Sequence, residues 1–564
     1  MIKNRIKDLK NKFKEHKIDG YIIPKNDDYF SEYAKNDRLK NITNFSGSAG
    51  VAVILKKKNY LFVDGRYTLQ AQKESAKNFD IVEIHNRSPN TIIKNCNLGY
   101  DPKLFTSKNL INYFSHNNLI SINENLIDQI FKFKEKTTKP FYSLSQKITG
   151  QTHQSKISKV VDFLKLNKAD YLFISAPENV AWLLNIRGYD NPNSPIPNAR
   201  LIISKNKKLF LVAKKNNTQI IIKEKKIKNN QIVNIKDLPN LINKLKGINF
   251  IVDNKTCSTF YENIIKLKFN ILDKKDPVYK LKAIKNSCEI NHIIQAHKKD
   301  GLALTRFIYW IKNVNKNKIS EVDAQNKLEQ FRKLNNDYLF PSFNTIAGTG
   351  SNGAIVHYRA TTKATKKISE KDIFLFDSGG QYRYGTTDVT RTICFSNQKQ
   401  YIKNAFTNVL KGHIAVVLAD LSKDNNGKKI DVKARKFLKK DGLDYAHGTG
   451  HGVGFFLNVH EGPQAISKYN TVKIEKGMIL SNEPGYYEEN HFGIRIENLV
   501  YVKQFKNKLC FENLTLAPIE KDLINYKLLN KIEKDYLFKY HLKIYSEYFD
   551  SLNKKERKWL ATFI

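Results

Sequence analysis

The sequence predicts an α+β protein of several domains, in which two related α/β domains precede a larger domain that carries the chemistry. Three observations lead to this prediction. The chain has 564 residues, too many for one compact core. In its first half, short apolar runs alternate with helical patterns, and one stretch of sequence recurs in weakened form. From about residue 285 onward, Gly, His and acidic residues gather between 340 and 500 in strand-like segments.

The first predicted domain spans residues 1–138. Residues 19–24 form an apolar run that predicts a strand, and residues 51–63 predict a hairpin across a Lys-Lys-Lys-Asn turn. We expect Asp64-Gly-Arg-Tyr67 to open a helix. Residues 132–140 are charged, poor in apolar side chains and end in Pro, which favours a linker at this point.

The second predicted domain spans residues 139–278 and resembles a copy of the first. Lys168-Ala-Asp-Tyr-Leu-Phe-Ile174 echoes Lys17-Ile-Asp-Gly-Tyr-Ile-Ile23. Farther along, Asn185-Ile-Arg-Gly188 echoes Asn44-Phe-Ser-Gly47 at a similar spacing. A repeated order of motifs indicates two related α/β domains.

The third predicted domain spans residues 279–564 and follows a boundary near Lys274-Lys-Asp-Pro277. Asn286 and Glu289 form a capping-box pattern, the signature of a helix start. The amphipathic run 290–311 comes directly after it. We therefore expect a long helix at the entrance to this domain.

The net charge of +42 suggests a nucleic-acid or anionic membrane surface, but the distribution of charge argues against that function. Only about one basic residue in seven is Arg, the side chain on which phosphate and base recognition depends. Lys is spread along the whole chain and occurs together with heavy use of Asn, Ile, Phe and Tyr, as A/T-rich codons would produce. We expect codon bias and no specific nucleic-acid partner.

The composition also predicts the cellular compartment of the protein. No window of about 20 apolar residues is free of charge, so we expect no membrane association. The first 20 residues form an amphipathic pattern without the apolar core of a secretory signal. The five cysteines are scattered and form no CxxC pair, as expected of reduced thiols in a cytoplasm. The predicted location is therefore cytoplasmic.

Two aspartates end or begin predicted strands 11 residues apart. The apolar run 373–376 predicts a buried strand and ends on Asp377, where a carboxylate is costly unless it is paired or coordinated. A turn-rich segment follows, and then a second predicted strand, Thr386–Phe395, with Asp388 near its start. A hairpin of this kind can bring both carboxylates to one point.

Three further side chains complete a candidate ligand set. His451 lies in a Gly-rich loop that lets the backbone pass close to a ligand. Glu483 ends an apolar run before a Pro-Gly turn. Glu497 shares one face of a predicted strand with Arg495, which would keep a ligating carboxylate ionised and oriented. Four carboxylates and one imidazole can hold two divalent cations, with Mn²⁺ preferred and Co²⁺ or Zn²⁺ possible.

The surrounding motifs resemble those of a known family. They are Asp377-Ser-Gly-Gly-Gln-Tyr382, His447-Gly-Thr-Gly-His-Gly-Val-Gly454, Leu457-Asn-Val-His-Glu-Gly-Pro463, Asn482-Glu-Pro-Gly-Tyr-Tyr487 and Gly493-Ile-Arg-Ile-Glu-Asn498. These motifs resemble the metallopeptidases of the pita-bread fold, which include methionine aminopeptidase, prolidase and aminopeptidase P. Most similar is the long, three-domain form of Xaa-Pro aminopeptidase. The resemblance implies a C-terminal pita-bread catalytic domain behind two creatinase-like α/β domains.

The resemblance also implies roles for individual residues. Asp377, Asp388 and Glu497 would hold one metal, and Asp388, His451, Glu483 and Glu497 the other, with a bridging hydroxide as the nucleophile and Glu483 as the general base. His357 and His460 would bind the scissile carbonyl and steady the tetrahedral intermediate. His447 would line a proline pocket. Arg66, from the first domain, and Arg495 complete the expected substrate-binding side chains.

The expected function is a metal-dependent aminopeptidase that releases the N-terminal residue from peptides with proline in second position. An Xaa-Pro bond lacks the N–H that many peptidases engage, and metals acting on the carbonyl do not need it. We also expect a homodimer, by likeness to the family. The alternatives are a dipeptide prolidase and a catalytically silent relative that only binds peptides or proteins.

Overall fold

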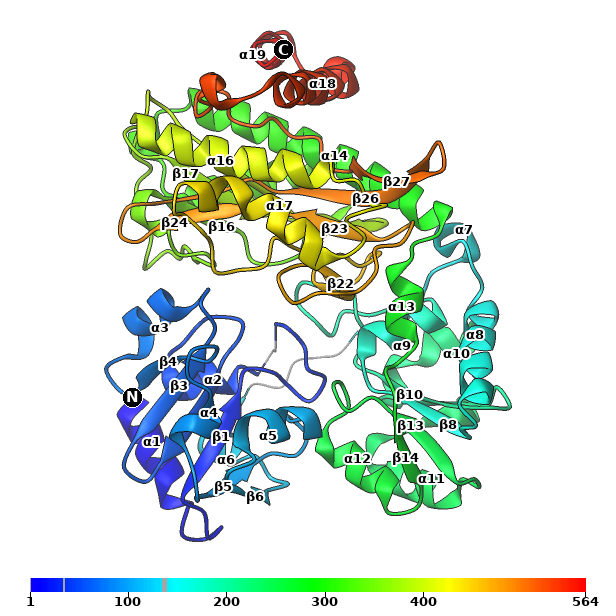
Figure 1. Ribbon diagram of the computed structural model, residues 1–564. Coiled ribbons are helices and arrows are strands. Elements are labelled where there is room, and N and C mark those ends of the chain that lie inside the picture. The colour runs from blue at the N-terminus through cyan, green and yellow to red at the C-terminus, as the bar shows by residue number, and fades with distance from the viewer. Residues whose placement is uncertain (1, 34–35, 134–138) are drawn as a thin grey trace. The chain divides into compact units, whose positions relative to one another are not determined.

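The computed structural model describes residues 2–33, 36–133 and 139–564, and the chain divides into two compact units, Met1–Tyr279 and Lys280–Ile564. Figure 1 shows the elements of both units in chain order. Most of the predicted linker, residues 134–138, lies outside the described residues.

The first unit contains two six-stranded sheets. The first sheet has the order β4-β3-β2-β1-β5-β6. Its strands are β1 (Gly20–Pro24), β2 (Val51–Leu55), β3 (Asn59–Val63), β4 (Asp80–Glu83), β5 (Asn97–Tyr100) and β6 (Asn118–Ser121). Strand β1 and the β2–β3 hairpin thus confirm the strands expected from the sequence, because β2 pairs antiparallel with both of its neighbours.

The second sheet repeats this order as β12-β11-β10-β8-β13-β14. Its strands are β8 (Tyr171–Ile174), β10 (Arg200–Ser204), β11 (Leu209–Val212), β12 (Ile232–Val233), β13 (Asn249–Val252) and β14 (Asn270–Asp273). Each pair of neighbouring strands also has the same direction as its counterpart in the first sheet. The predicted duplication of an α/β domain is therefore confirmed.

The echoed asparagines explain part of the repeat. Asn44 ends helix α2 (Arg38–Thr43) and Asn185 ends helix α9 (Pro177–Leu184), each in the left-handed conformation, with φ of 70° and 54°. Asn tolerates this conformation better than most residues, and it closes a helix there. The two copies therefore keep the same residue type at the same turn.

Helices cover both faces of these sheets, as the alternation of buried residues requires. On β1, Ile22 belongs to one apolar cluster, and Tyr21 and Ile23 belong to another on the opposite face. The described helices of this unit that have eight or more residues are α1 (Ile2–Asn11), α3 (Thr68–Ser75), α5 (Ser107–Phe114), α8 (His153–Leu166), α9 and α12 (Thr259–Lys266). Helix α3 starts directly after Tyr67, as predicted.

The second unit is built on curved antiparallel sheets. Its strands are β15 (Tyr338–Pro341), β16 (Ile346–Thr349), β17 (Phe374–Ser378), β18 (Gly380–Tyr382), β19 (Gly385–Thr386), β20 (Val389–Ile393), β21 (Gly450–Gly452), β22 (Glu461–Ile466), β23 (Ile479–Asn482), β24 (Gly485–Glu488), β25 (Phe492–Arg495), β26 (Asn498–Phe505) and β27 (Lys508–Asn513). They pair as β15-β18-β19, β16-β17-β20, β22-β21-β23-β26-β27 and β24-β25.

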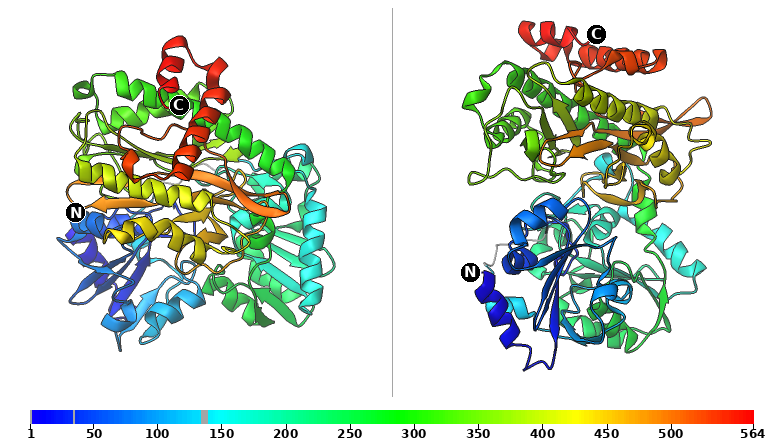
Figure 2. Two further views of the ribbon diagram at one scale, coloured as in Figure 1. Left: turned by 45° about the horizontal axis from the view of Figure 1, so that its top comes forward. Right: turned by 60° about the vertical axis from the view of Figure 1, so that its left-hand side comes forward.

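The second unit contains six helices of eight or more residues, of which α18 and α19 lie over other helices (Figures 1 and 2). The six helices are α14 (Ser287–Asn313), α15 (Glu321–Lys333), α16 (Gln400–Val417), α17 (Gly427–Lys440), α18 (Lys531–Tyr548) and α19 (Lys554–Ala561). The predicted capping box at the start of α14 is present, because the Asn286 side chain accepts from the Glu289 N–H and Glu289 accepts from Asn286 N–H. Helix α18 packs on α16, and α19 on α14.

One predicted strand was wrong in its extent. Residues 386–395 were expected to be continuous, but β19 pairs with β18 in one sheet and β20 pairs with β17 in another. Thr387 and Asp388 lie between them. The carbonyl of Thr387 accepts from Ser342 Oγ and its hydroxyl accepts from Gly380 N–H, so the break is held by hydrogen bonds. Asp388 therefore lies at the corner where the chain passes from one sheet to the other.

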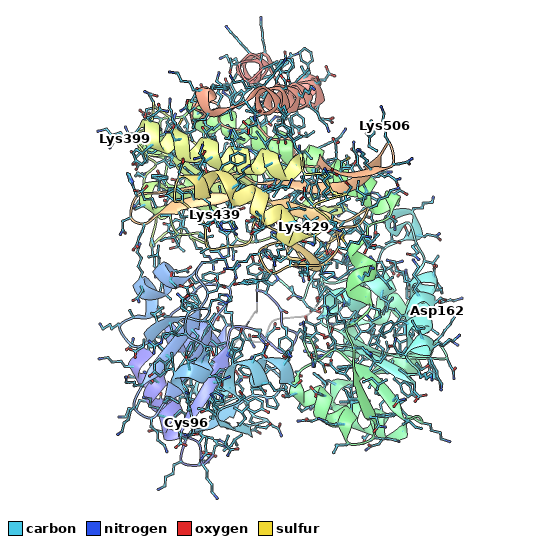
Figure 3. All side chains as sticks on the ribbon, in the orientation of Figure 1. Cys96, Asp162, Lys399, Lys429, Lys439 and Lys506 are labelled. Carbon is cyan, nitrogen blue, oxygen red and sulfur yellow. The ribbon has the colours of Figure 1, made fainter. Side chains whose placement is uncertain are left out.

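Within the described residues, no helix reaches the length and hydropathy that crossing a membrane requires. All five cysteines are free thiols. The lysines labelled in the second unit in Figure 3 point away from the protein at separate places: Lys399 before α16, Lys429 and Lys439 on α17, and Lys506 at the β26–β27 turn. These four charges are therefore exposed, and they are distributed over α17, the residue before α16 and the β26–β27 turn.

Candidate metal centre

The five predicted ligand side chains come from positions at or next to the ends of short strands in the second unit. Asp377 lies on β17 and Asp388 just before β20, and these two strands pair so that Asp377 faces Thr390. His451 lies on β21, at a register shift in its pairing with β22. Glu483 follows β23, and Glu497 lies between β25 and β26. The ends of separate strands therefore bring the side chains into one place.

Distances confirm that four of these side chains converge. His451 Nε2 lies 3.4 Å from Asp388 Oδ2 and 3.5 Å from Glu483 Oε1. One ligand atom each from Asp388, His451 and Glu497 lie within 4.8 Å of one another. Neighbouring ligands of one cation are separated by distances of this order.

The tautomer of His451 follows from its second nitrogen. Nδ1 lies 2.9 Å from the carbonyl oxygen of Gly452. Because a carbonyl only accepts, Nδ1 carries the proton in the neutral ring, and the lone pair of Nε2 faces the carboxylates. An imidazole held in this way is oriented as a metal ligand.

The carboxylates are buried without enough positive charge around them. Asp377 Oδ1 and Glu497 Oε1 are buried oxygens without a hydrogen-bond partner among the described residues. Burial raises the pKa of Asp388, Glu483 and Glu497 above their ordinary values. The pKa of Asp388 is raised further by the charges of Asp377 and Glu483. Such a cluster is costly unless cations bind it, so the donor set fits a pair of divalent metals.

Asp377 is held from behind by Arg495. Arg495 Nη2 donates to Asp377 Oδ2 at 2.7 Å, and its Nη1 donates to the hydroxyl of Tyr487 at 2.6 Å. That hydroxyl lies 2.9 Å from Nε2 of His447, whose Nδ1 lies 2.7 Å from the Gly448 carbonyl. The neutral His447 ring is therefore protonated at Nδ1, and Tyr487 donates to its Nε2.

Tyr487 and Thr390 are two members of the site that sequence reasoning did not single out. Burial raises the pKa of Tyr487 to about 12, so it remains a donor at neutral pH. The Thr390 hydroxyl donates to Glu497 Oε2 at 2.8 Å and accepts from Arg495 Nε at 3.0 Å. Tyr487 ends a quoted motif and Thr390 lies within a predicted strand, but only the three-dimensional contacts distinguish them from their neighbours.

The predicted substrate histidines are placed differently. His460 is exposed, and its ring centroid lies 4.2 Å from that of His451. His447 is half-buried between the rings of Tyr445 and Tyr487, at 4.9 and 5.5 Å. Both histidines thus lie beside the carboxylate cluster or the residues that support it.

His357 is half-buried in the loop that follows the 3-10 turn Gly350–Asn352. This loop starts at Gly353, whose carbonyl lies so close to Gly493 of β25 that a Cβ on Gly493 would meet it at 1.8 Å. The loop therefore packs against the strand that carries Arg495.

Arg66 belongs to the first unit, where Asp64 engages it. Its Nη2 donates to Asp64 Oδ2 at 2.7 Å and its Nε to Asp64 Oδ1 at 2.9 Å. The same guanidinium lies over the ring of Tyr67. Its expected contact with substrate remains a prediction.

Sequence profiles of known families match nearly the whole chain. The creatinase/prolidase N-terminal domain matches residues 5–130, and a second profile of that description matches residues 132–289. Metallopeptidase family M24 matches residues 291–504, and the C-terminal region of that peptidase family matches residues 507–562. The M24 match includes all five candidate ligands.

Individual relatives extend over the full length. The probable Xaa-Pro aminopeptidase P of Laccaria bicolor is 35% identical, over 95% of this chain and 89% of that protein. Xaa-Pro aminopeptidase 1 of Dictyostelium discoideum is 35% identical, over 100% and 96%. The crystal structure of an X-prolyl aminopeptidase from Caenorhabditis elegans, a cytosolic enzyme with a di-nuclear active site, superimposes with a TM-score of 0.92 at 28% identity, over 100% of this chain and 99% of that one.

Proposed function

The chain belongs to metallopeptidase family M24, and from that premise we propose that it is an aminopeptidase that releases the residue preceding proline at the N-terminus of peptides. The observation that carries the proposal is the convergence of Asp388, His451, Glu483 and Glu497 beside an Asp377 held by Arg495. The relatives that cover the full length are Xaa-Pro aminopeptidases, and they supply the substrate class.

Two divalent cations would be held by the five side chains. We assign Asp377, Asp388 and Glu497 to one cation, and Asp388, His451, Glu483 and Glu497 to the other. When bound, the pair would polarise a substrate carbonyl and lower the pKa of water. The oxygen-rich donor set favours Mn²⁺, with Co²⁺ or Zn²⁺ as the other candidates. Metal analysis of protein purified without added metal identifies the ion.

Glu483 is placed to accept and pass on a proton. Its Oε1 accepts from the Ser481 hydroxyl at 3.2 Å, which orients the carboxylate towards His451. Burial raises the pKa of Glu483 above its ordinary value, which makes the carboxylate a stronger base. Glu483 would take a proton from the attacking water and deliver it to the leaving nitrogen.

The histidines would bind the two sides of the scissile bond. His460 is exposed beside His451, so it can reach a carbonyl oxygen at the cluster and stabilise the charge that develops there. We assign the same role to His357, from its loop against β25. His447, packed between two tyrosine rings, presents an apolar edge that suits a proline ring.

The test is a peptidase assay with three substrate series. Purified protein is loaded with Mn²⁺ and given Xaa-Pro-Yaa tripeptides, Xaa-Pro dipeptides and Xaa-Ala-Yaa controls, alongside Asp388→Ala. We expect cleavage of the first series, little of the third, and loss of activity in the variant. Cleavage of dipeptides alone would identify a prolidase. No cleavage of any peptide by the metal-loaded protein would identify a silent relative.

We further propose a cytoplasmic homodimer that binds no specific nucleic acid. The free cysteines agree with a reducing compartment. Light scattering after size exclusion tests the dimer, and a gel shift with duplex DNA at physiological salt tests the last point.

A further inference from the structure

Arg391, on β20, is the most heavily hydrogen-bonded of the fully buried arginines whose contacts are described in the second unit. Only 1% of its surface is exposed. Its Nε donates to Pro518 O at 2.9 Å, its Nη1 to Thr390 O at 2.8 Å and Glu497 O at 2.6 Å. Its Nη2 lies within bonding distance of Asn498 Oδ1, Ala517 O and Tyr540 OH, at 2.8, 2.8 and 3.1 Å.

These contacts join three separate parts of the chain. Thr390 belongs to the same strand, and Glu497 and Asn498 belong to the β25–β26 corner that carries a candidate metal ligand. Ala517, Pro518 and Tyr540 belong to the segment after β27 and to α18. A planar guanidinium fixes such a geometry because its donors point in set directions.

Hydrogen bonds hold Glu497 at both its side chain and its backbone. The Thr390 hydroxyl donates to the carboxylate, and the Glu497 N–H donates to the Thr390 carbonyl at 3.1 Å. Arg391 Nη1 donates to the Glu497 carbonyl and to the Thr390 carbonyl that accepts from the Glu497 N–H. The position of this carboxylate therefore depends on the place at which the Arg391 side chain is held.

Helix α18 holds the far end of Arg391. The buried Tyr540 hydroxyl accepts from Arg391 Nη2 and lies 3.1 Å from the Ala517 carbonyl, to which it can donate. The next buried tyrosine of the helix, Tyr548, donates to Leu516 O at 3.0 Å, and Arg391 is not among its described contacts. The two tyrosines thus anchor the same tail segment, but only Tyr540 contacts Arg391.

We propose that Arg391 is a positioning residue, through which helix α18 sets the place of Glu497 and thereby the affinity for metal. The inference deepens the proposed function and rests on it for the role of Glu497. It assigns to α18 a task in the metal site beyond its packing on α16. Residues that orient metal ligands commonly contribute about 10–100-fold to metal affinity.

The test compares Tyr540→Phe with Tyr548→Phe, which each remove one buried hydroxyl from α18. Co²⁺ is titrated into the full-length metal-free proteins, and its visible absorption is recorded together with the melting temperature. We expect Tyr540→Phe to weaken Co²⁺ binding about 10-fold and to shift the absorption bands. Tyr548→Phe should bind Co²⁺ within about twofold of wild type, although it melts earlier.

Arg391→Lys keeps the charge but removes the planar guanidinium with its several donors. Its loss of Co²⁺ affinity should therefore be at least as large as that of Tyr540→Phe. If Arg391→Lys does not fold, the comparison of Tyr540→Phe with Tyr548→Phe still decides whether Arg391 positions Glu497. Equal weakening by both tyrosine variants, or unchanged binding by Tyr540→Phe, would overturn the inference. If wild type binds Co²⁺ but cleaves no Xaa-Pro peptide, the proposed substrate is wrong, and the comparison of metal affinities still decides the role of Arg391.

Discussion

Arg495 Nη2 donates to Asp377 Oδ2 across 2.7 Å while the other oxygen of Asp377 stays buried without a partner among the described residues. One carboxylate oxygen is thus committed to the protein, and the other is left for a cation. Side chains of the site act on the guanidinium in return: burial lowers the pKa of Arg495, but Tyr487, Asp377 and Glu483 together raise it above its ordinary value. Arg495 therefore serves as a fixed positive charge behind the metal ligands.

Arg495→Lys should lower kcat and metal affinity about 10–100-fold without unfolding the protein. Lysine keeps the charge but cannot bind Asp377, Tyr487 and Thr390 at the same time as Arg495 does. Steady-state kinetics and Mn²⁺ titration measure the effect. A variant with wild-type metal affinity would show that charge alone is sufficient.

Asp388→Asn should stabilise the metal-free protein and abolish the stabilisation by metal. Burial and the charges of Asp377 and Glu483 raise the pKa of Asp388, so its ionised form is strained at neutral pH. A neutral amide relieves this repulsion. In EDTA, the melting temperature of the variant should be a few degrees above that of wild type, since each kcal/mol gained in the free energy of unfolding raises it by about 2–4 °C. Wild type, unlike the variant, should gain stability on adding Mn²⁺. A lower melting temperature of the variant in EDTA would contradict this account.

Glu461→Gln should destabilise the second unit by about 3–5 kcal/mol, because two buried ammonium groups lose their counter-charge. Lys285 and Lys282 both bind this carboxylate, and all three side chains are at most 2% exposed. Thermal unfolding measures the loss. Adding Lys285→Met should recover part of it, since one unpaired charge is removed. No recovery would indicate that packing, and not charge, dominates.

Tyr487→Phe should raise KM for Xaa-Pro-Yaa peptides several-fold, because His447 loses the hydroxyl that fixes its ring. Tyr486→Phe is the matched control, since Tyr486 is the preceding residue of β24 and packs on Phe492 instead. We expect wild-type KM for this control. Equal changes in both variants would assign the effect to the hairpin as a whole.

Stability should fall on acidification because three histidines are buried in neutral form. Burial lowers the pKa of His297 and His541 to about 4 and that of His413 to about 3, from 6.5. Between about pH 4 and 6.5, these three histidines therefore bind up to three protons more in the unfolded chain than in the folded one. Their stabilising contribution is complete above pH 6.5 and decreases by roughly 4 kcal/mol per pH unit near pH 5.

His297→Gln isolates one of these protons. The amide can still donate to the Ile293 carbonyl, as Nδ1 does. Proton uptake on unfolding, obtained from melting temperature and enthalpy against pH, should fall by about one. Other titrating groups cancel in the comparison with wild type. If the proton uptake on unfolding is the same in His297→Gln and wild type, the proton binds at a group other than His297.

Much of the fold could be predicted from the sequence, and the sequence also supplied a set of candidate ligands. The strand run ending in Asp377, the capping box at Asn286 and the echoed Asn44 and Asn185 are local patterns whose physics acts within a few residues. Candidate ligands could be chosen because an acid after an apolar run is costly without a partner. The sequence by itself therefore determined the duplicated domains and the list of candidate ligands.

Tertiary structure decided what joins those ligands. Strand 386–395 divides at Asp388 because its halves pair in different sheets, which no local pattern encodes. The contacts of Thr390, Arg391, Tyr487 and Tyr540 span up to about 150 positions along the chain. Hydrogen bonds depend on distances of about 3 Å, and sequence spacing specifies such distances only within one element. For this reason the list of candidate ligands follows from the sequence, and the side chains that orient these candidates follow only from the folded protein.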